Sequence, residues 1–368
     1  MMGGRSPADA DIRVLDLFSG AGGLSAGFCS ESTRFSTLRA IEHDKAAAAT
    51  YAENHDPETV FAGGIEEWLK AEDPPEADIV IGGPPCQGFS ALGKQEKLDE
   101  RNQLWLRYAE TIRKSKPKYF VLENVPQFLS SVQLTRFKRQ CQPSQPLGAY
   151  TFQAQVLNAA DYGAAQIRRR VILIGHHRDL PFPDFPLETH RKVADDCHQE
   201  WRTLGEVLGD LRRAVTEIDL PSRTIEVSGT LLPGAFKTSE LHLTRHYEQL
   251  SIDRFRSIPA DGNRFDIPED LLSECWKKHV SGSGDVMGRL NFDKPSVTIR
   301  TEFFKPEKGR YLHPTAHRAI THHEAARIQG FPDDYKWVGS KVAIARQIGN
   351  AVPLPLARAI GAHLARLF

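Results

Sequence analysis

Short apolar runs alternate with helix-like stretches along the first half of this 368-residue chain. This alternation is the feature that most constrains the fold. The apolar runs cover residues 12–18, 36–41, 79–81, 119–122 and 171–174, and helical stretches lie between them, through about residue 29, at 46–49 and over about 103–114. Such a rhythm is typical of βαβ units, whose strands are covered by helices on both faces. The sequence therefore predicts an α/β fold built on a doubly wound sheet.

The texture of the chain changes after Gly175. From about residue 181 to 293, prolines, glycines and polar residues dominate, and no regular exchange of strands and helices is visible. With 40% hydrophobic residues the chain can bury a full core, and its length suits one large domain with a smaller addition. We therefore expect a second, irregular α+β region.

Charge and composition narrow the class of protein. Residues 1–100 contain 8 Lys and Arg against 18 Asp and Glu, whereas residues 277–318 contain 9 against 4. A basic stretch is compatible with phosphate contact and an acidic region with a cationic small molecule, although both can simply be solvated faces. No apolar run approaches the roughly 20 residues of a membrane span, and the first residues lack a signal-peptide core. These features predict a cytoplasmic protein without membrane association.

A glycine-rich turn follows the first predicted strand, in the run DLFSGAGGLS of residues 16–25. At the carboxyl edge of a parallel sheet, such a turn exposes backbone N–H groups to a ligand. Glu42 ends the second predicted strand, where a carboxylate can accept hydrogen bonds from ribose hydroxyls. The turn departs from the dinucleotide fingerprint because Ser25 stands where the third glycine or alanine belongs. The pattern indicates an adenosyl-type cofactor, with a plain tight turn or a nicotinamide site as alternatives.

The third predicted strand runs into GGPPCQGFS, residues 82–90, which sets Cys86 behind two prolines. Buried structural cysteines usually have apolar neighbours, whereas two prolines hold the backbone rigid where it leaves the sheet. Cys86 is therefore a candidate nucleophile, the alternative being a structural cysteine. Glu123 ends the next predicted strand at the same edge. In QIRRR, residues 166–170, extended backbone puts Arg168 and Arg170 on one face, so we expect both to reach one pocket.

The order of these motifs resembles the cytosine-C5 DNA methyltransferase family over nearly the whole chain. The resemblance rests on DLFSGAGGLS, the acidic end of the second strand, GGPPCQGFS, ENV at 123–125, QIRRR, RAITHHEAARIQGFPDDY at 318–335 and QIGNAVPLPLARAIG at 347–361. It implies a Rossmann-like S-adenosylmethionine-dependent catalytic domain, residues 1–180 plus 342–368. It also implies a smaller target-recognition domain, residues 181–341.

The same resemblance implies a DNA (cytosine-5-)-methyltransferase of a bacterial type that forms a covalent adduct between cysteine and C6 of a flipped cytosine. By this resemblance the catalytic residues are Cys86, Glu123, Arg168 and Arg170. The residues expected to bind S-adenosylmethionine are Phe18, Ser19, Gly20, Gly22, Gly23, Leu24, Glu42, His43, Ile65, Pro84, Asn102, Leu104, Asn350, Ala351 and Val352. The residues expected to contact DNA are Gln87, Ser90, Gln166 and Arg300.

One departure from the family pattern bears on cofactor binding, besides smaller ones at Ala165 and His323. Gly64 stands where the family usually has an aspartate that accepts the adenine amino group, and Glu66 or a main-chain carbonyl is the available substitute. The histidines at 176–177 and 322–323 are adjacent rather than one helical turn apart, so no metal site is expected.

The expected partners are double-stranded DNA and a cognate restriction endonuclease or defence-system proteins. The enzyme is expected to be a monomer and to associate with the nucleoid while acting. Two other functions remain open, namely the same chemistry on tRNA and a catalytically silent DNA-binding regulator.

Overall fold

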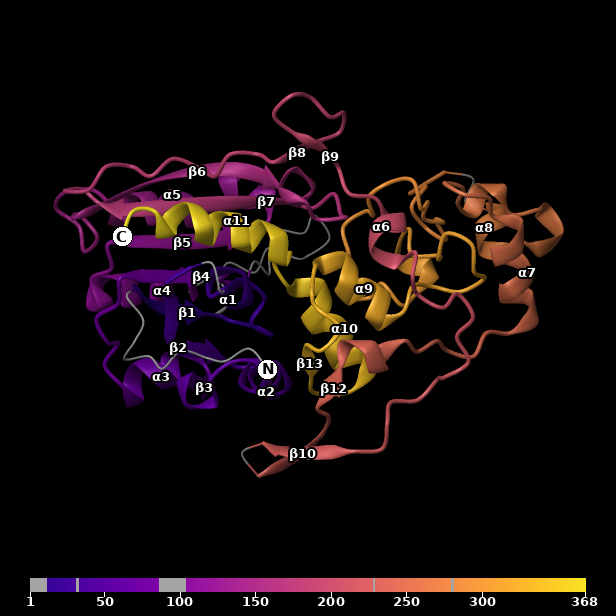
Figure 1. The fold of residues 1–368 in the computed structure, drawn as a ribbon, viewed down its shortest axis with the longest axis horizontal. Coiled ribbons are helices and arrows are strands. Elements are labelled where there is room, and N and C mark those ends of the chain that lie inside the picture. Colours follow the sequence, from indigo (N-terminus) through magenta and orange to yellow (C-terminus); the bar gives the residue numbers. More distant parts are fainter. Residues whose placement is uncertain (1–11, 31–32, 86–103, 228, 279–280) are drawn as a thin grey trace. The chain divides into compact units, whose positions relative to one another are not determined.

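The computed structural model describes residues 12–30, 33–85, 104–227, 229–278 and 281–368 (Figure 1). The chain divides into two compact units. Unit 1 comprises Met1–Tyr162, Arg169–Glu188 and Val352–Phe368, and unit 2 comprises Gly163–Arg168 and Thr189–Ala351. Among the described residues, no helix combines the length and the apolar character required to cross a bilayer.

Unit 1 is built on a seven-stranded sheet with the order β3-β2-β1-β4-β5-β7-β6. Its strands are β1 (Ile12–Leu17), β2 (Phe35–Glu42), β3 (Val60–Ala62), β4 (Ile79–Gly82), β5 (Tyr119–Asn124), β6 (Tyr150–Asn158) and β7 (Arg169–His177). The five strands β1 to β5 are parallel, and β7 is antiparallel to both β5 and β6. The predicted α/β class is confirmed, with an antiparallel edge that the apolar runs did not reveal.

The helices of unit 1 connect and cover these strands (Figure 1). They are α1 (Gly23–Phe28), α2 (Lys45–Asn54), α3 (Ile65–Ala71), α4 (Leu104–Ser115), α5 (Val132–Gln140) and α11 (Leu354–Ala365), with short 3-10 turns η2 (Pro57–Thr59), η4 (Pro126–Ser130) and η5 (Ala159–Tyr162). α11 packs on α1, and a Cβ on Gly27 would lie 2.3 Å from the Cβ of Ala357. The close contact fixes the helix that follows the glycine-rich turn against the C-terminal helix.

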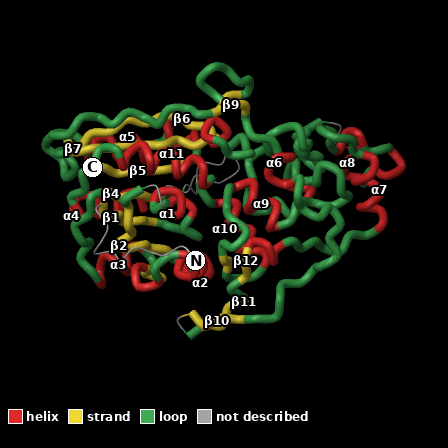
Figure 2. Tube along the Cα trace, in the orientation of Figure 1, coloured by secondary structure: helices red, strands yellow, loops and turns green. Residues whose placement is uncertain are grey.

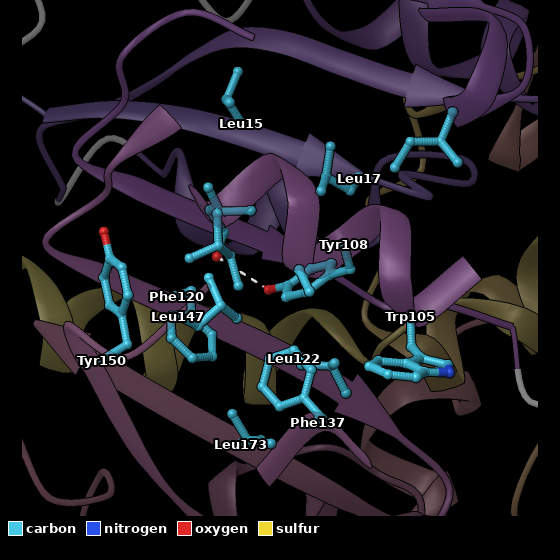
Figure 3. Close-up of a cluster of buried hydrophobic side chains, with 14 of the residues drawn as sticks. Leu15, Leu17, Trp105, Tyr108, Phe120, Leu122, Phe137, Leu147, Tyr150 and Leu173 are labelled. Carbon is cyan, nitrogen blue, oxygen red and sulfur yellow. Dashed lines mark hydrogen bonds between the residues drawn. The ribbon is translucent and has the colours of Figure 1, made fainter. Parts of the chain in front are cut away.

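The main core of unit 1 lies between the sheet and α4 and α5 (Figure 3). Phe120, Leu122 and Leu173 contribute from the strands, and Tyr108 and Phe137 from the helices. The Tyr108 hydroxyl donates to the carbonyl of Val121 at 2.7 Å, so the one polar group of this ring is satisfied inside the core. Burial of these large side chains supplies most of the free energy that holds the helices on the sheet.

Unit 2 is mostly loop, with short elements (Figure 2). Its strands form three two-stranded sheets: β8 (His190–Arg191) with β9 (Gln199–Glu200), β10 (Thr224–Val227) with β11 (Thr230–Pro233), and β12 (Phe236–Lys237) with β13 (Lys336–Trp337). Its helices are α6 (Leu204–Leu208), α7 (Gln249–Ser257), α8 (Glu274–Lys278), α9 (His322–Gln329) and α10 (Lys341–Asn350), with 3-10 turns η6 (Thr238–Leu241), η7 (Arg264–Asp266), η8 (Glu269–Leu271) and η9 (Pro306–Lys308).

The boundaries of the two compact units fall at different residues from the predicted domain boundaries. Residues 163–168 and 342–351 belong to unit 2, and residues 181–188 belong to unit 1. Hydrogen bonds of two glutamine side chains join residues 163–168 and 342–351 to unit 2. The amide of Gln166 donates to the side-chain oxygen of Gln329 at 2.8 Å, and Gln329 also donates to the carbonyl of Ile348 in α10 at 2.6 Å.

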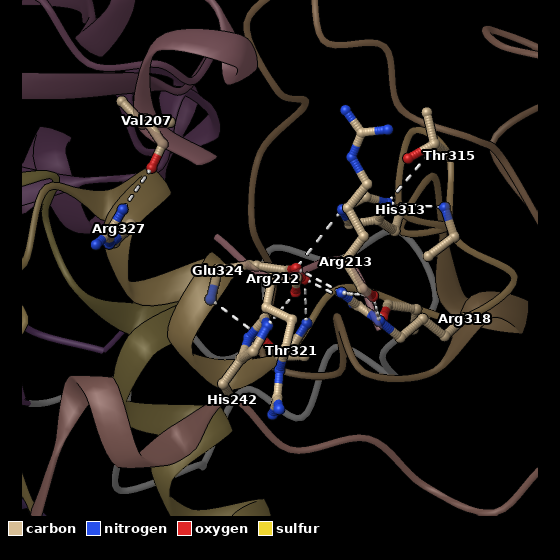
Figure 4. A network of polar contacts seen from close by, with 12 residues as sticks. Val207, Arg212, Arg213, His242, His313, Thr315, Arg318, Thr321, Glu324 and Arg327 are labelled. Carbon is tan, nitrogen blue, oxygen red and sulfur yellow. Dashed lines mark hydrogen bonds and ion pairs between the residues drawn. The ribbon is translucent and has the colours of Figure 1, made fainter. Parts of the chain in front are cut away.

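A buried ion pair organises unit 2 around the start of α9 (Figure 4). The guanidinium of Arg318 donates to both carboxylate oxygens of Glu324 at 2.7 and 2.8 Å. Glu324 also accepts the backbone N–H of Thr321 at 2.7 Å, and the Thr321 hydroxyl caps the helix by accepting the N–H of Glu324 at 3.1 Å. Burial alone would raise the pKa of Glu324, but the hydrogen bonds and charge of Arg318 hold it below its usual value.

Candidate active site

The carboxyl ends of β1, β2, β4 and β5 share one edge of the sheet. In an open α/β sheet, ligands bind at this edge where the strand order reverses. Here β1 continues to β2 on one side, and β4 lies on its other side. The strand ends are in direct contact there, because a Cβ on Gly82 would lie 2.3 Å from the carbonyl oxygen of Leu17. The glycine-rich turn after β1 and the Gly82–Pro85 segment after β4 therefore flank the switch point.

Three residues of the glycine-rich turn have left-handed backbone. The φ angles are 58° at Phe18, 56° at Gly20 and 85° at Gly22. A phenylalanine rarely adopts a positive φ, and such residues concentrate at ligand sites. The N–H of Ser19 donates to the carbonyl of Ile41 at 3.1 Å, which ties the turn to the end of β2. Leu24 and Gly23 are buried in the first turn of α1.

Glu42 is the central acceptor of this half of the site. It is 6% exposed, and one carboxylate oxygen accepts the N–H of Gly20 at 2.9 Å. The other accepts the N–H of Asp44 at 2.7 Å and lies 3.0 Å from Nδ1 of the exposed His43. Because a carboxylate oxygen can accept more than one hydrogen bond, Glu42 retains capacity for ligand hydroxyls.

Two buried polar atoms beside the turn point to a ligand. Oδ1 of Asp16 and Oγ of Ser19 have no hydrogen-bond partner among the described residues, although both side chains are buried. Buried polar groups normally have partners, so a polar ligand at this turn fits the observation. Burial raises the pKa of Asp16 to about 7, the hydrogen bond from Ser25 opposes the rise, and the charge of Glu42 adds to it.

This pKa predicts a pH-dependent stability that Asp16→Asn removes. The pKa is about 7 in the folded protein and has its ordinary value of 3.8 in the unfolded chain, so the stabilisation by the bound proton is complete below pH 3.8. It is lost as pH rises through about 7. From pH 5 to pH 8, the free energy of unfolding of the ligand-free Asp16→Asn variant should therefore rise by about 2–3 kcal/mol relative to that of wild type. Urea unfolding at both pH values measures this, and an equal difference at pH 5 and 8 would contradict it.

The second half of the site is the ion pair of Glu123 and Arg170. Nε of Arg170 lies 2.8 Å from the Glu123 carboxylate, and both side chains are largely buried. The other carboxylate oxygen of Glu123 faces Gly83, where a Cβ would lie 2.9 Å from it. The amide of Asn124 donates to the carbonyl of Pro84 at 3.0 Å. At the end of β5, Asn124 thus holds the Gly82–Pro85 segment and Glu123 lies close beside it.

Cys86, Gln87, Ser90 and Asn102 lie outside the described residues, and Pro85 is the last described residue before them. Leu104 begins α4 and Ile65 begins α3, where it is buried. Gly64 precedes α3 and donates its N–H to Glu67 at 3.1 Å. Glu66, the side chain available to replace the missing aspartate, lies 3.5 Å from Nε of Arg107.

Arg168 and Arg170 have different partners. Arg168 belongs to unit 2, where it is buried and donates to the carbonyls of Ile299 and Gly349 at 2.7 and 2.8 Å. The backbone N–H of Ile299 in turn donates to Gln166 at 2.8 Å. We expected one pocket for both guanidinium groups. Within unit 1, Arg170 contacts Glu123. The shared pocket stays a prediction, since β7 begins at Arg169 and the two arginines belong to different units.

The remaining predicted residues lie in both units. Arg300 adjoins Ile299 in unit 2, and a Cβ on Gly349 would lie 2.5 Å from the carbonyl carbon of Arg300. Asn350 ends α10 in unit 2, Ala351 follows it, and Val352 is buried in unit 1 ahead of α11.

Sequence reasoning assigned no role to Asp16 or Asn124. Both stand inside the motifs quoted above. Each is a polar residue in an otherwise apolar strand, and burial of a polar group without a hydrogen-bond partner costs free energy. This pattern could have marked both residues as parts of the site.

Comparison with known proteins places this site in a family. The model of the family described as C-5 cytosine-specific DNA methylase matches residues 12–366. The chain is 30% identical over 359 residues to the Type II methyltransferase M1.HphI of Haemophilus parahaemolyticus, covering 95% of this chain and 85% of that protein. It is 33% identical over 383 residues to the Type II methyltransferase M.XorII of Xanthomonas oryzae pv. oryzae, covering 95% and 84%.

Among solved structures, a prophage-encoded E. coli protein described as a DNA modification methyltransferase has the same fold. Its TM-score is 0.72 at 23% identity, and the match covers 97% of this chain and 99% of that one. The family match extends over nearly all of the chain and includes every motif at the sheet edge. The chain belongs to the C-5 cytosine-specific DNA methylase family and is an enzyme of the DNA (cytosine-5-)-methyltransferase class.

Proposed function

We propose that this enzyme transfers a methyl group from S-adenosylmethionine to C5 of a flipped cytosine within a specific duplex DNA sequence. The observation that carries the proposal is the Glu123–Arg170 pair, held at 2.8 Å beside the Gly82–Pro85 segment that leads to Cys86. The same sheet edge carries the strained glycine-rich turn and Glu42. A charged acceptor pair, a cofactor turn and the segment that precedes Cys86 in sequence thus lie at the ends of neighbouring strands.

The chemistry of cytosine explains why these residues are needed. C5 is too weak a nucleophile to be methylated until the ring is activated. Cys86 as thiolate forms a bond from Sγ to C6, and the electrons of the 5,6 double bond become available at C5. Glu123 holds a proton at N3 and so stabilises the negative charge that develops on the ring. When C5 later loses its proton, the Sγ–C6 bond breaks and the double bond is restored.

Arg170 orients Glu123 for this role. Its guanidinium holds one carboxylate oxygen at 2.8 Å, and the other oxygen, beside Gly83, would meet the base. A nearby cationic group also favours the thiolate form of a cysteine. Arg168, in contrast, joins the Gln166 segment to the Ile299 and Gly349 loops of unit 2. We propose a supporting role for it.

The residues at the turn fit S-adenosylmethionine, which when bound supplies an electrophilic methyl group on a sulfonium. Glu42 would hold the ribose hydroxyls, Phe18 would stack on the cofactor, and the backbone at Gly20 and Gly22 would allow close approach. The unpaired Oδ1 of Asp16 and Oγ of Ser19 would gain polar partners. The carboxylate of Glu42 also suits a cationic ligand, as does Asp16 once it is deprotonated above a pH of about 7.

Unit 2 is proposed to read the DNA sequence, because its loops carry polar side chains that can reach base edges. Flipping the target base costs roughly a few kcal/mol, which DNA contacts must supply. The relatives named above are Type II methyltransferases. We therefore also propose a cognate endonuclease as partner and a cytoplasmic site of action.

The test is sequencing of DNA from cells that express the protein, beside cells with an empty vector, with chemistry that reads 5-methylcytosine. A short methylated sequence present only in the expressing cells is the expected result, and it also identifies the recognition site. Total tRNA from the same cells is sequenced in parallel. Methylation of tRNA with unmodified DNA would replace this proposal with the tRNA enzyme, and the absence of both marks would reject methyl transfer.

A further inference from the structure

A buried hydrogen-bonded chain lies beneath the glycine-rich turn. Tyr51 of α2 is fully buried, and its hydroxyl donates to Oγ of Ser25 at 2.9 Å. The Ser25 hydroxyl in turn donates to Oδ2 of Asp16 at 2.6 Å. Thr37 of β2 lies 3.3 Å from the same tyrosine oxygen. One side chain therefore links the end of β1, the start of α1 and the middle of β2.

The rings of Tyr51 and His55 form the floor of the turn. Their centroids are 4.3 Å apart and the rings are tilted by 35°. A Cβ on Gly22 would lie 2.7 Å from Nε2 of His55 and 3.0 Å from Cδ2 of Tyr51. The backbone of Gly22 therefore sits directly on the two rings. Burial lowers the pKa of His55 to about 4, so the ring packs there as a neutral group at neutral pH.

We propose that Tyr51 and His55 are positioning residues that set the height and orientation of the glycine-rich turn for the methyl donor. The inference rests on the proposed function, because it takes this turn as the site of the donor. The turn strains the backbone at Phe18, whose φ is 58°, and its internal hydrogen bond from the N–H of Gly22 to the carbonyl of Ser19 is 3.0 Å long. The Tyr51 and His55 rings and the Tyr51–Ser25–Asp16 chain add support to the turn from α2.

This hydrogen-bonded chain explains why residue 25 is a serine. A serine replaces the small residue expected at the third position of a dinucleotide-type turn, and the structure shows its hydroxyl buried between Tyr51 and Asp16. A network of this kind specifies one geometry when all its members are satisfied. Loss of one hydroxyl should therefore change the turn more than it changes the fold.

The test compares Tyr51→Phe with Tyr108→Phe. Tyr108 is equally buried in unit 1, and its hydroxyl donates to the carbonyl of Val121 in β5 and not to a residue of the turn. Calorimetry measures the Kd for S-adenosylhomocysteine, the demethylated cofactor, so the readout is independent of turnover. We expect Tyr51→Phe to raise this Kd about five- to tenfold, as loss of one buried hydrogen bond implies. Tyr108→Phe should leave it within about twofold.

Steady-state kinetics and a second variant complete the test. Tyr51→Phe should raise KM for the cofactor while kcat and the Kd for DNA stay within about twofold, since no reacting group is touched. His55→Ala, which removes half of the floor, should also raise the Kd for S-adenosylhomocysteine. Equal effects of Tyr51→Phe and Tyr108→Phe on that Kd, or unchanged binding in both Tyr51→Phe and His55→Ala, would overturn the inference. Wild-type protein that fails to bind S-adenosylhomocysteine would instead refute the proposed function.

Discussion

Replacement of Cys86 by alanine is expected to abolish methylation, with a loss of at least about 10^4-fold in methyl transfer to duplex DNA. The reason is that C5 of cytosine gains its nucleophilicity only through the bond from Sγ to C6, and no other thiol is available in the motif. Transfer of a labelled methyl group to DNA that carries the identified recognition sequence measures the loss. Cys86→Ala should retain the wild-type Kd for S-adenosylhomocysteine, because the thiol is proposed to contact the base alone.

Cys275→Ala is the matched control. Cys275 is an exposed free cysteine in unit 2, so its replacement should leave the rate within about twofold. DNA with 5-fluorocytosine at the target position adds a direct readout. A base can remove a proton from C5 but cannot remove fluorine in this way, so the Sγ–C6 bond persists. Wild type should form a denaturant-resistant complex with this DNA, and Cys86→Ala should not. Retained methylation in the variant would refute covalent catalysis by Cys86.

The parts of unit 1 that follow from burial could be predicted from the sequence. β1, β4 and β5 are buried over most of their length, so most of their residues are apolar and the strands stand out in the sequence. Strand ends in such a sheet share an edge, so the meeting of Glu42, Gly83 and Glu123 at that edge follows from order along the chain. β3 has three residues and β6 is only half buried, so neither produced a comparable run.

The parts that depend on partners distant in sequence could not be predicted. The acceptors of Arg168 are an example, because its guanidinium donates to the carbonyl of Ile299 while Arg170 pairs with Glu123. A local pattern cannot show that Ile299 and Gly349 provide those acceptors more than 130 residues away. The two-residue strands of unit 2 are likewise defined by pairing and not by composition.

The link between Asp16, Ser25 and Tyr51 shows the same limit inside a recognised motif. All three residues are visible in the sequence, but the tyrosine reads as one residue of an alanine-rich helix. Only the packing of α2 beside the turn brings its hydroxyl to Ser25. Motif reasoning therefore locates the site, whereas the structure identifies what holds it in shape.

Glu324→Gln is expected to destabilise unit 2 by about 3–5 kcal/mol, because it leaves the charge of Arg318 buried without its carboxylate. Arg318 and Glu324 are both almost fully buried and share two hydrogen bonds. Glu302→Gln is the control, since Glu302 pairs with Lys305 and Lys308 in the same unit but is 43% exposed. It should cost less than about 1 kcal/mol.

Hydrogen exchange of the α9 amides measures this difference locally, and urea unfolding measures it for the whole chain. We expect Glu324→Gln to accelerate exchange in α9 and to lower the urea midpoint, while the strands of unit 1 keep their protection. Because α9 carries Gln329, which holds Gln166 and α10, loss of this pair should also reduce methylation by raising the Kd for DNA. Equal protection of α9 in Glu324→Gln and Glu302→Gln would show that the buried pair is dispensable for the shape of unit 2.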